Sequence, residues 1–143
     1  MRIYVASSWR NEYLGVVIAR LRLAGHKMFD FRDPDGAFSW ANVDPKWTHA
    51  FLQGLNHPEA RRGFSRDMAG LRGAEVVLLV LPCGRSAHLE AGWAKGSGKP
   101  FLVYLPEPIE AELMYGMADL VTDDLSLIID WLQKFSPGRG SWT

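Results

Sequence analysis

Two apolar runs without alternation constrain the fold of this chain more than any other feature. Val76–Leu81 reads VVLLVL, and Phe101–Leu105 reads FLVYL. A strand in which every residue is apolar is typical of a parallel sheet that is covered on both faces. The residues between the two runs, Ala87–Lys95, have the pattern of a helix. The segment therefore predicts a β-α-β unit, in which a helix joins two parallel strands.

The rest of the chain repeats this alternation of strands and helices. Further strands are expected at Arg2–Ala6, Lys27–Phe31 and Leu120–Thr122, and further helices at Tyr13–Ala24, Pro58–Gly73 and Ile109–Met117, with a last helix opened by Asp123 and Asp124. The order predicts an α/β fold: a three-layer α/β/α sandwich with a mainly parallel five-stranded sheet, flavodoxin-like or Rossmann-like. We expect residues 1–143 to form a single domain.

The segment 32–47 interrupts the alternation. It contains two prolines and the aromatic residues Phe38, Trp40 and Trp47. A loop of this length without its own structure is usually functional or disordered, and the aromatic residues argue against disorder. Two interpretations stay open, an active-site flap and a surface excursion that packs on the protein.

Charge and hydropathy exclude several classes of protein. The sequence has 16 Lys and Arg against 16 Asp and Glu, which argues against a partner that is a nucleic-acid polymer. No apolar run approaches the roughly 20 residues of a membrane span. The sequence begins directly with a predicted strand, so we expect no signal peptide. The only cysteine, Cys83, indicates a reducing compartment. We therefore expect a cytoplasmic protein without a membrane partner.

Motifs for metals and common cofactors are missing from the sequence. The histidines His26, His49 and His57 do not have the spacing of metal ligands, so no metal is assigned. Neither a P-loop nor a GxGxxG turn follows any predicted strand. We expect no cofactor.

Glu90 is the most conspicuous candidate for chemistry. It lies about one turn into the helix that follows Val76–Leu81, and ligands of open α/β sheets bind at the carboxyl ends of the strands. A capping box would place an acid three residues after the N-cap, and with Ser86 as N-cap that position is Leu89. Two interpretations stay open, a functional carboxylate and an acid that the helix dipole favours.

Two polar loops are expected at the same edge of the sheet. Gly84, Arg85 and Ser86 combine free amides at a helix start with a guanidinium, which suits an anion. The alternative is an ordinary N-cap by Ser86. After the first strand, Ser7, Ser8 and Arg10 would suit a phosphate, and the alternative is simple loop polarity.

Asp67 and Cys83 carry weaker signals. Arg66 directly precedes Asp67, and other arginines lie nearby, so a surface ion pair is the plainer interpretation by spacing alone. Cys83 would need a base to act as a nucleophile, and His88 is the only histidine close to it in the sequence.

Together, these segments resemble the nucleoside 2-deoxyribosyltransferase superfamily, which includes 2′-deoxynucleoside 5′-phosphate N-hydrolases. The matching segments are IYVASSWR (Ile3–Arg10), RDMAGLRGAEVVLLVLP (Arg66–Pro82), HLEAGWAKGSGKPFLVYL (His88–Leu105) and LMYGMAD (Leu113–Asp119). HPE (His57–Glu59) is similar to a helix start of the transferases. The most specific part is the order of an aspartate, a strand, Glu-x-Gly and Gly-Lys-Pro.

The resemblance implies a role for each matching residue. Glu90 would be the nucleophile, Asp67 would help to handle the base or its proton, and Tyr4 would orient the nucleophile. The implied substrate-binding residues are Ser7, Ser8, Trp9, Arg10, Gly84, Arg85, Ser86 and Met114. Among them, Ser8 and Arg10 match the loop that holds a 5′-phosphate in the hydrolase branch. The loop Leu113–Asp119 of a neighbouring subunit completes the active site in that family, which implies a homodimer or a larger homo-oligomer.

One position departs from the pattern of the family, and this difference bears on the choice of substrate. Gly84 stands six residues before Glu90, where the transferases have a further aspartate. The resemblance therefore implies cleavage or transfer at the N-glycosidic bond of a nucleoside 5′-monophosphate or a nucleoside, with the phosphate-bearing substrate favoured. The reaction would pass through a covalent glycosyl-Glu90 intermediate.

Two other functions remain possible on the same sequence. One is a non-catalytic nucleotide-binding or sensor domain, since fold does not fix function. The other is a lysine-decarboxylase-like phosphoribohydrolase, whose PGGxGT turn is matched poorly by Pro82–Ser86. Candidates for stacking on a base are Trp9, Phe38, Trp40 and Trp47, for which packing in the protein is the alternative.

Overall fold

The computed structural model describes residues 1–33, 35–43 and 51–135. Two compact units divide the chain, Met1–Phe29 with Ala74–Thr143 and, between these segments, Asp30–Gly73. The single domain expected for residues 1–143 stays a prediction. Among the described helices, none is long and apolar enough to cross a membrane.

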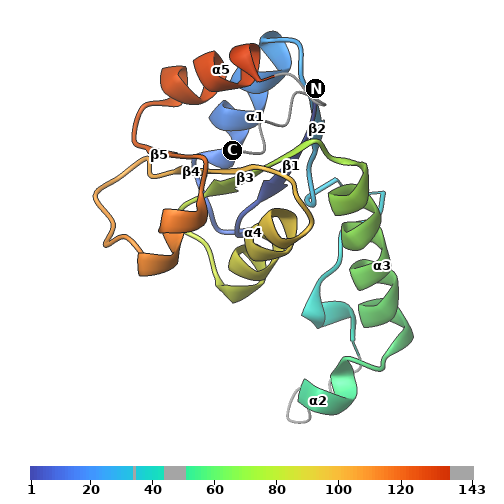
Figure 1. Ribbon diagram of the computed structural model, residues 1–143. Helices are drawn as coiled ribbons and strands as arrows, with labels where there is room; N and C mark the ends of the chain where they lie inside the picture. The colour runs from blue at the N-terminus through green and yellow to red at the C-terminus, as the bar shows by residue number, and fades with distance from the viewer. Residues whose placement is uncertain (34, 44–50, 136–143) are drawn as a thin grey trace. The chain divides into compact units, whose positions relative to one another are not determined.

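The first unit is built on a five-stranded sheet (Figure 1). Its strands are β1 (Arg2–Ala6), β2 (Lys27–Phe29), β3 (Val76–Val80), β4 (Phe101–Tyr104) and β5 (Leu120–Thr122). All neighbouring strands pair in parallel, in the order β2-β1-β3-β4-β5. This is the flavodoxin-like order, so the predicted α/β class is confirmed.

Helices on both faces of the sheet explain why β3 is apolar throughout. The helices α1 (Leu14–Leu23) and α5 (Leu125–Lys134) lie on one face, and α4 (Arg85–Gly96) lies on the other (Figure 1). All five residues of β3 are buried. Each buried Val or Leu side chain stabilises the fold by about 1.5–3 kcal/mol. The connections through α1 and α4 run in opposite directions across the sheet, and right-handed crossovers place such helices on opposite faces.

Gly25 ends α1 as the sequence predicts. Its φ of +93° is a left-handed conformation that glycine adopts without steric cost. The Gly25 N–H donates to the Arg22 carbonyl (2.9 Å), and the His26 N–H donates to the Leu21 carbonyl (3.1 Å). These two bonds form a Schellman motif, which satisfies carbonyl groups at the end of the helix.

The second unit consists of short helical elements and one longer helix. They are η1, a 3-10 helix (Trp40–Asn42), α2 (Phe51–Gly54) and α3 (Pro58–Gly73). Phe38 approaches α3 so closely that a Cβ atom at Gly63 would lie 2.8 Å from its Cβ atom. The rings of Phe38 and Trp40 meet edge to face, with 5.0 Å between centroids. This packing supports the packed interpretation for residues 35–43, whereas residues 34 and 44–47, including Trp47, lie outside the described residues.

Several predicted boundaries are wrong, each for a local reason. β2 ends at Phe29 because the Asp30 carboxylate accepts a hydrogen bond from the Arg32 backbone N–H (3.0 Å), which turns the chain. The helix expected over Ile109–Met117 is only η3, a 3-10 helix over Leu113–Met117. The residues before η3 are mostly exposed and present no apolar stripe that could hold a longer helix against the sheet.

We expect Gly25→Ala to lower the free energy of unfolding by about 1–2 kcal/mol, because alanine is strained in the left-handed region. Gly15→Ala in the same helix is the control, since added Cβ atoms at Gly15 and at Gly25 both meet open space. That control should be neutral or stabilising by up to about 1 kcal/mol. Urea denaturation measures both variants, and equal effects would contradict the assignment of Gly25 as the helix stop.

Candidate active site

The strand order places a switch point between β1 and β3. From β1 the chain crosses to β2 on one side, and from β3 it crosses to β4 on the other. Ligands of open α/β sheets bind at such a point, outside the carboxyl ends of the strands. Here the loop 7–13 follows β1 and the turn 81–84 follows β3. Most of the predicted substrate-binding residues lie in or beside these two segments.

A buried amide joins the two segments. Asn11 is 5% exposed, and its Nδ2 donates to the carbonyls of Val80 (3.2 Å) and Pro82 (3.1 Å). Its Oδ1 accepts from the Tyr13 N–H (2.8 Å). The Ser7 hydroxyl also donates to the Val80 carbonyl (2.8 Å). Ser7, predicted to bind substrate, therefore directs its hydroxyl proton to the backbone.

Sequence reasoning missed Asn11. Its signal is its place just before the first predicted helix, where Asn side chains commonly bond to nearby backbone groups. What the sequence does not reveal is that the same side chain reaches the end of β3, far along the chain. Asn11 thus fixes the β1 loop to the β3 turn.

The other predicted residues of the β1 loop are more accessible to solvent. Trp9 and Arg10 are exposed, and Ser8 is partly exposed. The Ser8 hydroxyl oxygen accepts from the Arg10 backbone N–H (3.3 Å), so the loop is folded on itself. The exposed guanidinium at this edge is suited to an anionic group of a ligand.

The helix α4 begins at Arg85, and Gly84 is its N-cap. The expectation that Ser86 is the cap is wrong, because Arg85 and Ser86 already lie in the first helical turn. No side chain caps the helix, and the Gly84 carbonyl lies 2.7 Å from Nδ1 of His88. Glu90 is six residues after the cap, so a capping role for its carboxylate is excluded.

The turns of α4 place Glu90 on the flank that faces β1. Ala87, Ala91 and Ala94 are the buried residues of this helix, and it packs on β1, β3 and β4. At 100° per residue, His88 and Glu90 lie on opposite flanks of this stripe. His88 contacts Tyr115, which follows β4. Glu90 therefore lies on the side of the switch point.

Electrostatics link Glu90 to the β3 turn. Burial, followed by the negative charge of Glu90, raises the pKa of the Cys83 thiol to about 12. The thiol is therefore neutral near pH 7, and Cys83 lacks the thiolate that a nucleophile needs. The role of Glu90 as the nucleophile stays a prediction.

The remaining predicted residues lie in different surroundings. Tyr4 is fully buried in β1 and stacks on Phe29 with 4.9 Å between ring centroids. Met114 is exposed on η3. Asp67 lies on α3 in the second unit, where burial raises the pKa of its carboxyl and the nearby Arg66 acts in the opposite direction. The roles of Tyr4 and Asp67 beside Glu90 stay predictions.

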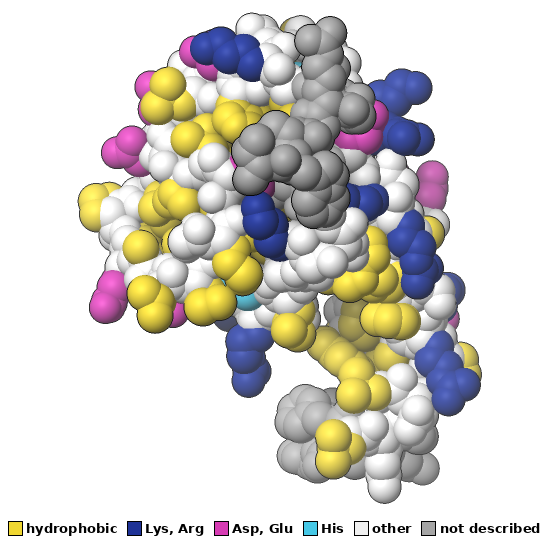
Figure 2. All heavy atoms as spheres, in the orientation of Figure 1, with side chains coloured by type: hydrophobic (Ala, Val, Ile, Leu, Met, Phe, Trp, Pro, Cys, Tyr) yellow, Lys and Arg dark blue, Asp and Glu magenta, His cyan; other side chains and the backbone are white. Residues whose placement is uncertain are grey.

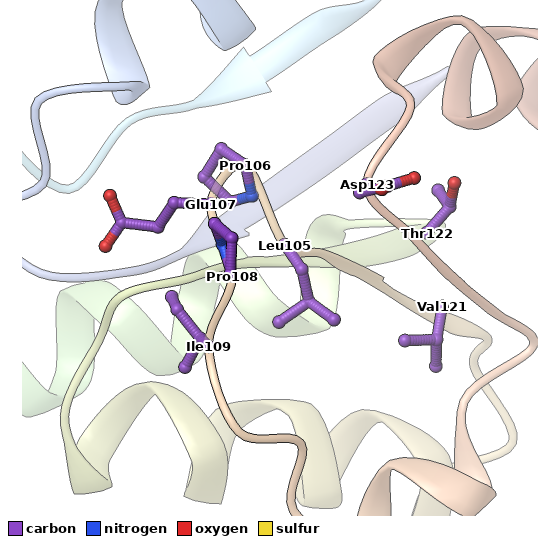
Figure 3. Close-up of a pocket in the computed structure, with 8 residues that line it drawn as sticks. All are labelled: Leu105, Pro106, Glu107, Pro108, Ile109, Val121, Thr122 and Asp123. Carbon is purple, nitrogen blue, oxygen red and sulfur yellow. The ribbon is translucent and has the colours of Figure 1, made fainter.

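A hollow of about 550 Å³ lies at the carboxyl ends of β4 and β5 (Figure 3). It is lined by Leu105, Pro106, Glu107, Pro108, Ile109, Val121, Thr122 and Asp123. The Tyr13 hydroxyl donates to Oε2 of Glu107 (2.6 Å), and this bond connects the rim of the hollow to the β1 loop. None of the predicted site residues lines this hollow. Within residues 1–33, 35–43 and 51–135, no group of three or more His, Cys, Asp or Glu side chains is placed to hold a metal ion.

Alkylation of Cys83 should show its raised pKa. In the native protein we expect the rate of reaction with iodoacetamide still to rise about tenfold per pH unit between about pH 9 and pH 10, because the thiolate fraction is still growing. In urea the rate should level off near the ordinary thiol pKa of about 8.5. Intact-mass spectrometry measures both rates. A native rate that levels off below pH 9 would contradict this assignment.

Two solved structures share this fold at low sequence identity. One is a 2-deoxyribosyltransferase from the psychrotolerant bacterium Bacillus psychrosaccharolyticus, with a TM-score of 0.66 and 20% identity over 91% of each chain. The other is a CMP N-glycosidase from Clostridium botulinum, with a TM-score of 0.50 and 13% identity over 93% of this chain and 99% of that chain. No family model and no curated protein sequence matches the chain. The predicted resemblance is confirmed at the level of structure: this chain has the fold of a 2-deoxyribosyltransferase.

Proposed function

We propose that this protein cleaves or exchanges the N-glycosidic bond of a nucleoside 5′-monophosphate or a nucleoside, with Glu90 as the nucleophile. The observation that carries the proposal is the position of Glu90 on the β1-facing flank of α4, at the switch point of the sheet. The shared fold supports this class of reaction, since one structural neighbour is named for deoxyribosyl transfer and the other for N-glycosidic cleavage of CMP.

In the first step of the proposed reaction, a carboxylate placed below the anomeric carbon attacks it. A Glu90 oxygen forms a bond to C1′ while the bond from C1′ to the base nitrogen breaks, and the base leaves with that electron pair. A proton delivered to the base eases its departure. By the resemblance, Asp67 is our candidate for handling this proton, and burial raises the pKa of its carboxyl, the direction that favours a proton donor.

The second step decides between hydrolysis and transfer. Water attacks C1′ of the glycosyl-Glu90 ester while the bond from C1′ to Glu90 breaks, and its proton returns to the carboxylate that protonated the leaving base. Alternatively, a second base attacks C1′ through its ring nitrogen, gives up its proton to the same carboxylate and forms a new nucleoside. In both cases the Glu90 carboxylate is regenerated. This reaction needs no cofactor, because the carboxylate supplies the electron pair.

A 5′-phosphate suits the charges at this edge of the sheet. Arg10 and Arg85 are both exposed there, and the first turn of α4 has backbone N–H groups that no side chain caps. Anions are stabilised at such a helix start. Gly84 provides no carboxylate that would repel a phosphate. We therefore favour the monophosphate over the free nucleoside as substrate.

The oligomer is part of the proposal. In η3, Leu113 is 91% exposed and Met114 is 60% exposed, which is unusual for large apolar side chains and typical of a contact surface. By the resemblance, this segment of a neighbouring subunit would complete the site. A cytoplasmic homodimer or larger homo-oligomer is the assembly that we propose.

Glu90→Gln should reduce the release of free base by at least about a thousandfold, because the amide cannot form the glycosyl ester. The assay incubates the protein with a panel of ribo- and deoxyribonucleosides and their 5′-monophosphates, with and without an acceptor base. Intact-mass spectrometry after rapid acid quenching should show a glycosyl adduct on the wild type and none on the variant.

Glu110→Gln is the control, since Glu110 is an exposed acid on the loop after β4. It should retain wild-type activity. Unchanged base release in Glu90→Gln would remove Glu90 as the nucleophile. Saturable nucleotide binding without any free base, even at high protein concentration, would instead support the non-catalytic nucleotide-binding domain.

Arg10→Ala should raise KM for the 5′-monophosphate about 10- to 100-fold, because a charge-assisted hydrogen bond is lost. KM for the corresponding nucleoside should change less than about twofold. Arg20→Ala, at an exposed arginine of α1, is the matched control. Equal changes in KM for both substrates would contradict a phosphate site at Arg10.

A further inference from the structure

His88 connects three segments at the start of α4. Its Nδ1 lies 2.7 Å from the Gly84 carbonyl oxygen and 3.8 Å from Sγ of Cys83. Its Nε2 lies 2.8 Å from the Tyr115 hydroxyl in η3. The two rings are also nearly parallel, at 11°, with 5.7 Å between centroids. One side chain therefore contacts the β3 turn and the 3-10 helix that follows β4.

The partners of His88 fix the positions of its protons. A carbonyl oxygen only accepts, so the proton of the neutral imidazole lies on Nδ1 and is donated to Gly84. Nε2 is then an acceptor, and the Tyr115 hydroxyl donates to it. Burial raises the pKa of Tyr115 to about 12, with smaller contributions from Cys83 and Glu112, so this hydroxyl keeps its proton near neutral pH.

The bond holds a short segment that is next fixed to β4 just after its end, where Asp119 and Phe101 exchange two hydrogen bonds (2.9 and 3.1 Å). Tyr115 is 7% exposed and is the buried residue of η3. Its neighbours Leu113, Met114 and Met117 are exposed at 91%, 60% and 38%. Hydrophobic side chains reach the surface over η3 and the start of α4 (Figure 2). Tyr115 is therefore the side chain that anchors the 3-10 helix itself.

We infer that His88 is a positioning residue: through the hydrogen bond from Tyr115 it pins Leu113–Met117 beside the glutamate-bearing helix. In the proposed assembly this segment completes the site of a neighbouring subunit, so its position governs affinity for the substrate. The inference rests on the proposed function for the substrate, while the pin itself is a property of the free protein. His88 lies on the flank of α4 opposite Glu90, so it acts through η3 and not on the reacting atoms.

Two variants break the same hydrogen bond from opposite sides. Tyr115→Phe keeps the ring and removes the donor. His88→Asn retains an amide that can reach the Gly84 carbonyl and is too short to reach Tyr115. Tyr104→Phe, on β4, is the matched control, because within residues 1–33, 35–43 and 51–135 the Tyr104 hydroxyl makes no hydrogen bond. His88→Gln is the rescue, since its longer side chain can place an acceptor near the position of Nε2.

Hydrogen exchange tests the pin without any substrate. The amides of Tyr115 and Ala118 bond to the Glu112 and Tyr115 carbonyls at 3.0 and 2.9 Å, so their exchange reports on η3. Each single variant should accelerate this exchange roughly three- to tenfold, and the double variant should do no more than either single one. The control should have no effect, and His88→Gln should recover part of the protection.

Kinetics tests the consequence for the substrate. Each single variant should raise KM for the 5′-monophosphate roughly three- to tenfold and change kcat less than about twofold. Unchanged exchange, or effects that multiply in the double variant, would overturn the pin. Faster exchange with unchanged KM would overturn its role in affinity. If the wild type neither binds nor cleaves any nucleotide, the proposed function fails, and the exchange data alone then decide whether the pin exists.

Discussion

The parallel pairing of β1 with β3 is the constraint on which the rest of the structure depends. Because both strands run in the same direction, their carboxyl ends meet at one edge, and residues more than 70 positions apart become neighbours there. Parallel pairing also requires helical crossovers, which bury β3 on both faces. The same geometry that makes the core apolar therefore gathers polar loops at one edge.

Much of this architecture was predictable from sequence, for a physical reason. The uninterrupted apolar run of β3 reports burial on both faces, and helical spacing with Pro58 at the start and Gly73 at the end bounds α3 correctly. The start of the helix after the β3 turn was harder to predict. Ser86 is a common N-cap residue, but the helix starts at Arg85 with Gly84 as its N-cap, two residues before the position that residue type suggests.

In the candidate site, too, some residues follow from local sequence pattern and others only from contacts between distant segments. The sequence places Glu90 near the carboxyl end of β3, because strand and helix boundaries follow from local pattern. It does not reveal Asn11 or the His88–Tyr115 bond, because each joins segments whose contact exists only after the sheet has formed. For the same reason the raised pKa of Cys83 is invisible in the sequence, since burial causes most of the shift.

The amide of Asn11 has a consequence for molecular selection. By bonding to the carbonyls of Val80 and Pro82, it ties the loop that carries Arg10 to the turn that precedes α4. In the proposed reaction Arg10 binds the phosphate of a sugar phosphate, and Glu90 attacks C1′ at the other end of the sugar. The site then selects ligands by the distance between their anionic group and their reactive carbon. A ligand in which these two groups are separated by the wrong number of bonds cannot reach Arg10 and Glu90 at once, whatever base it carries.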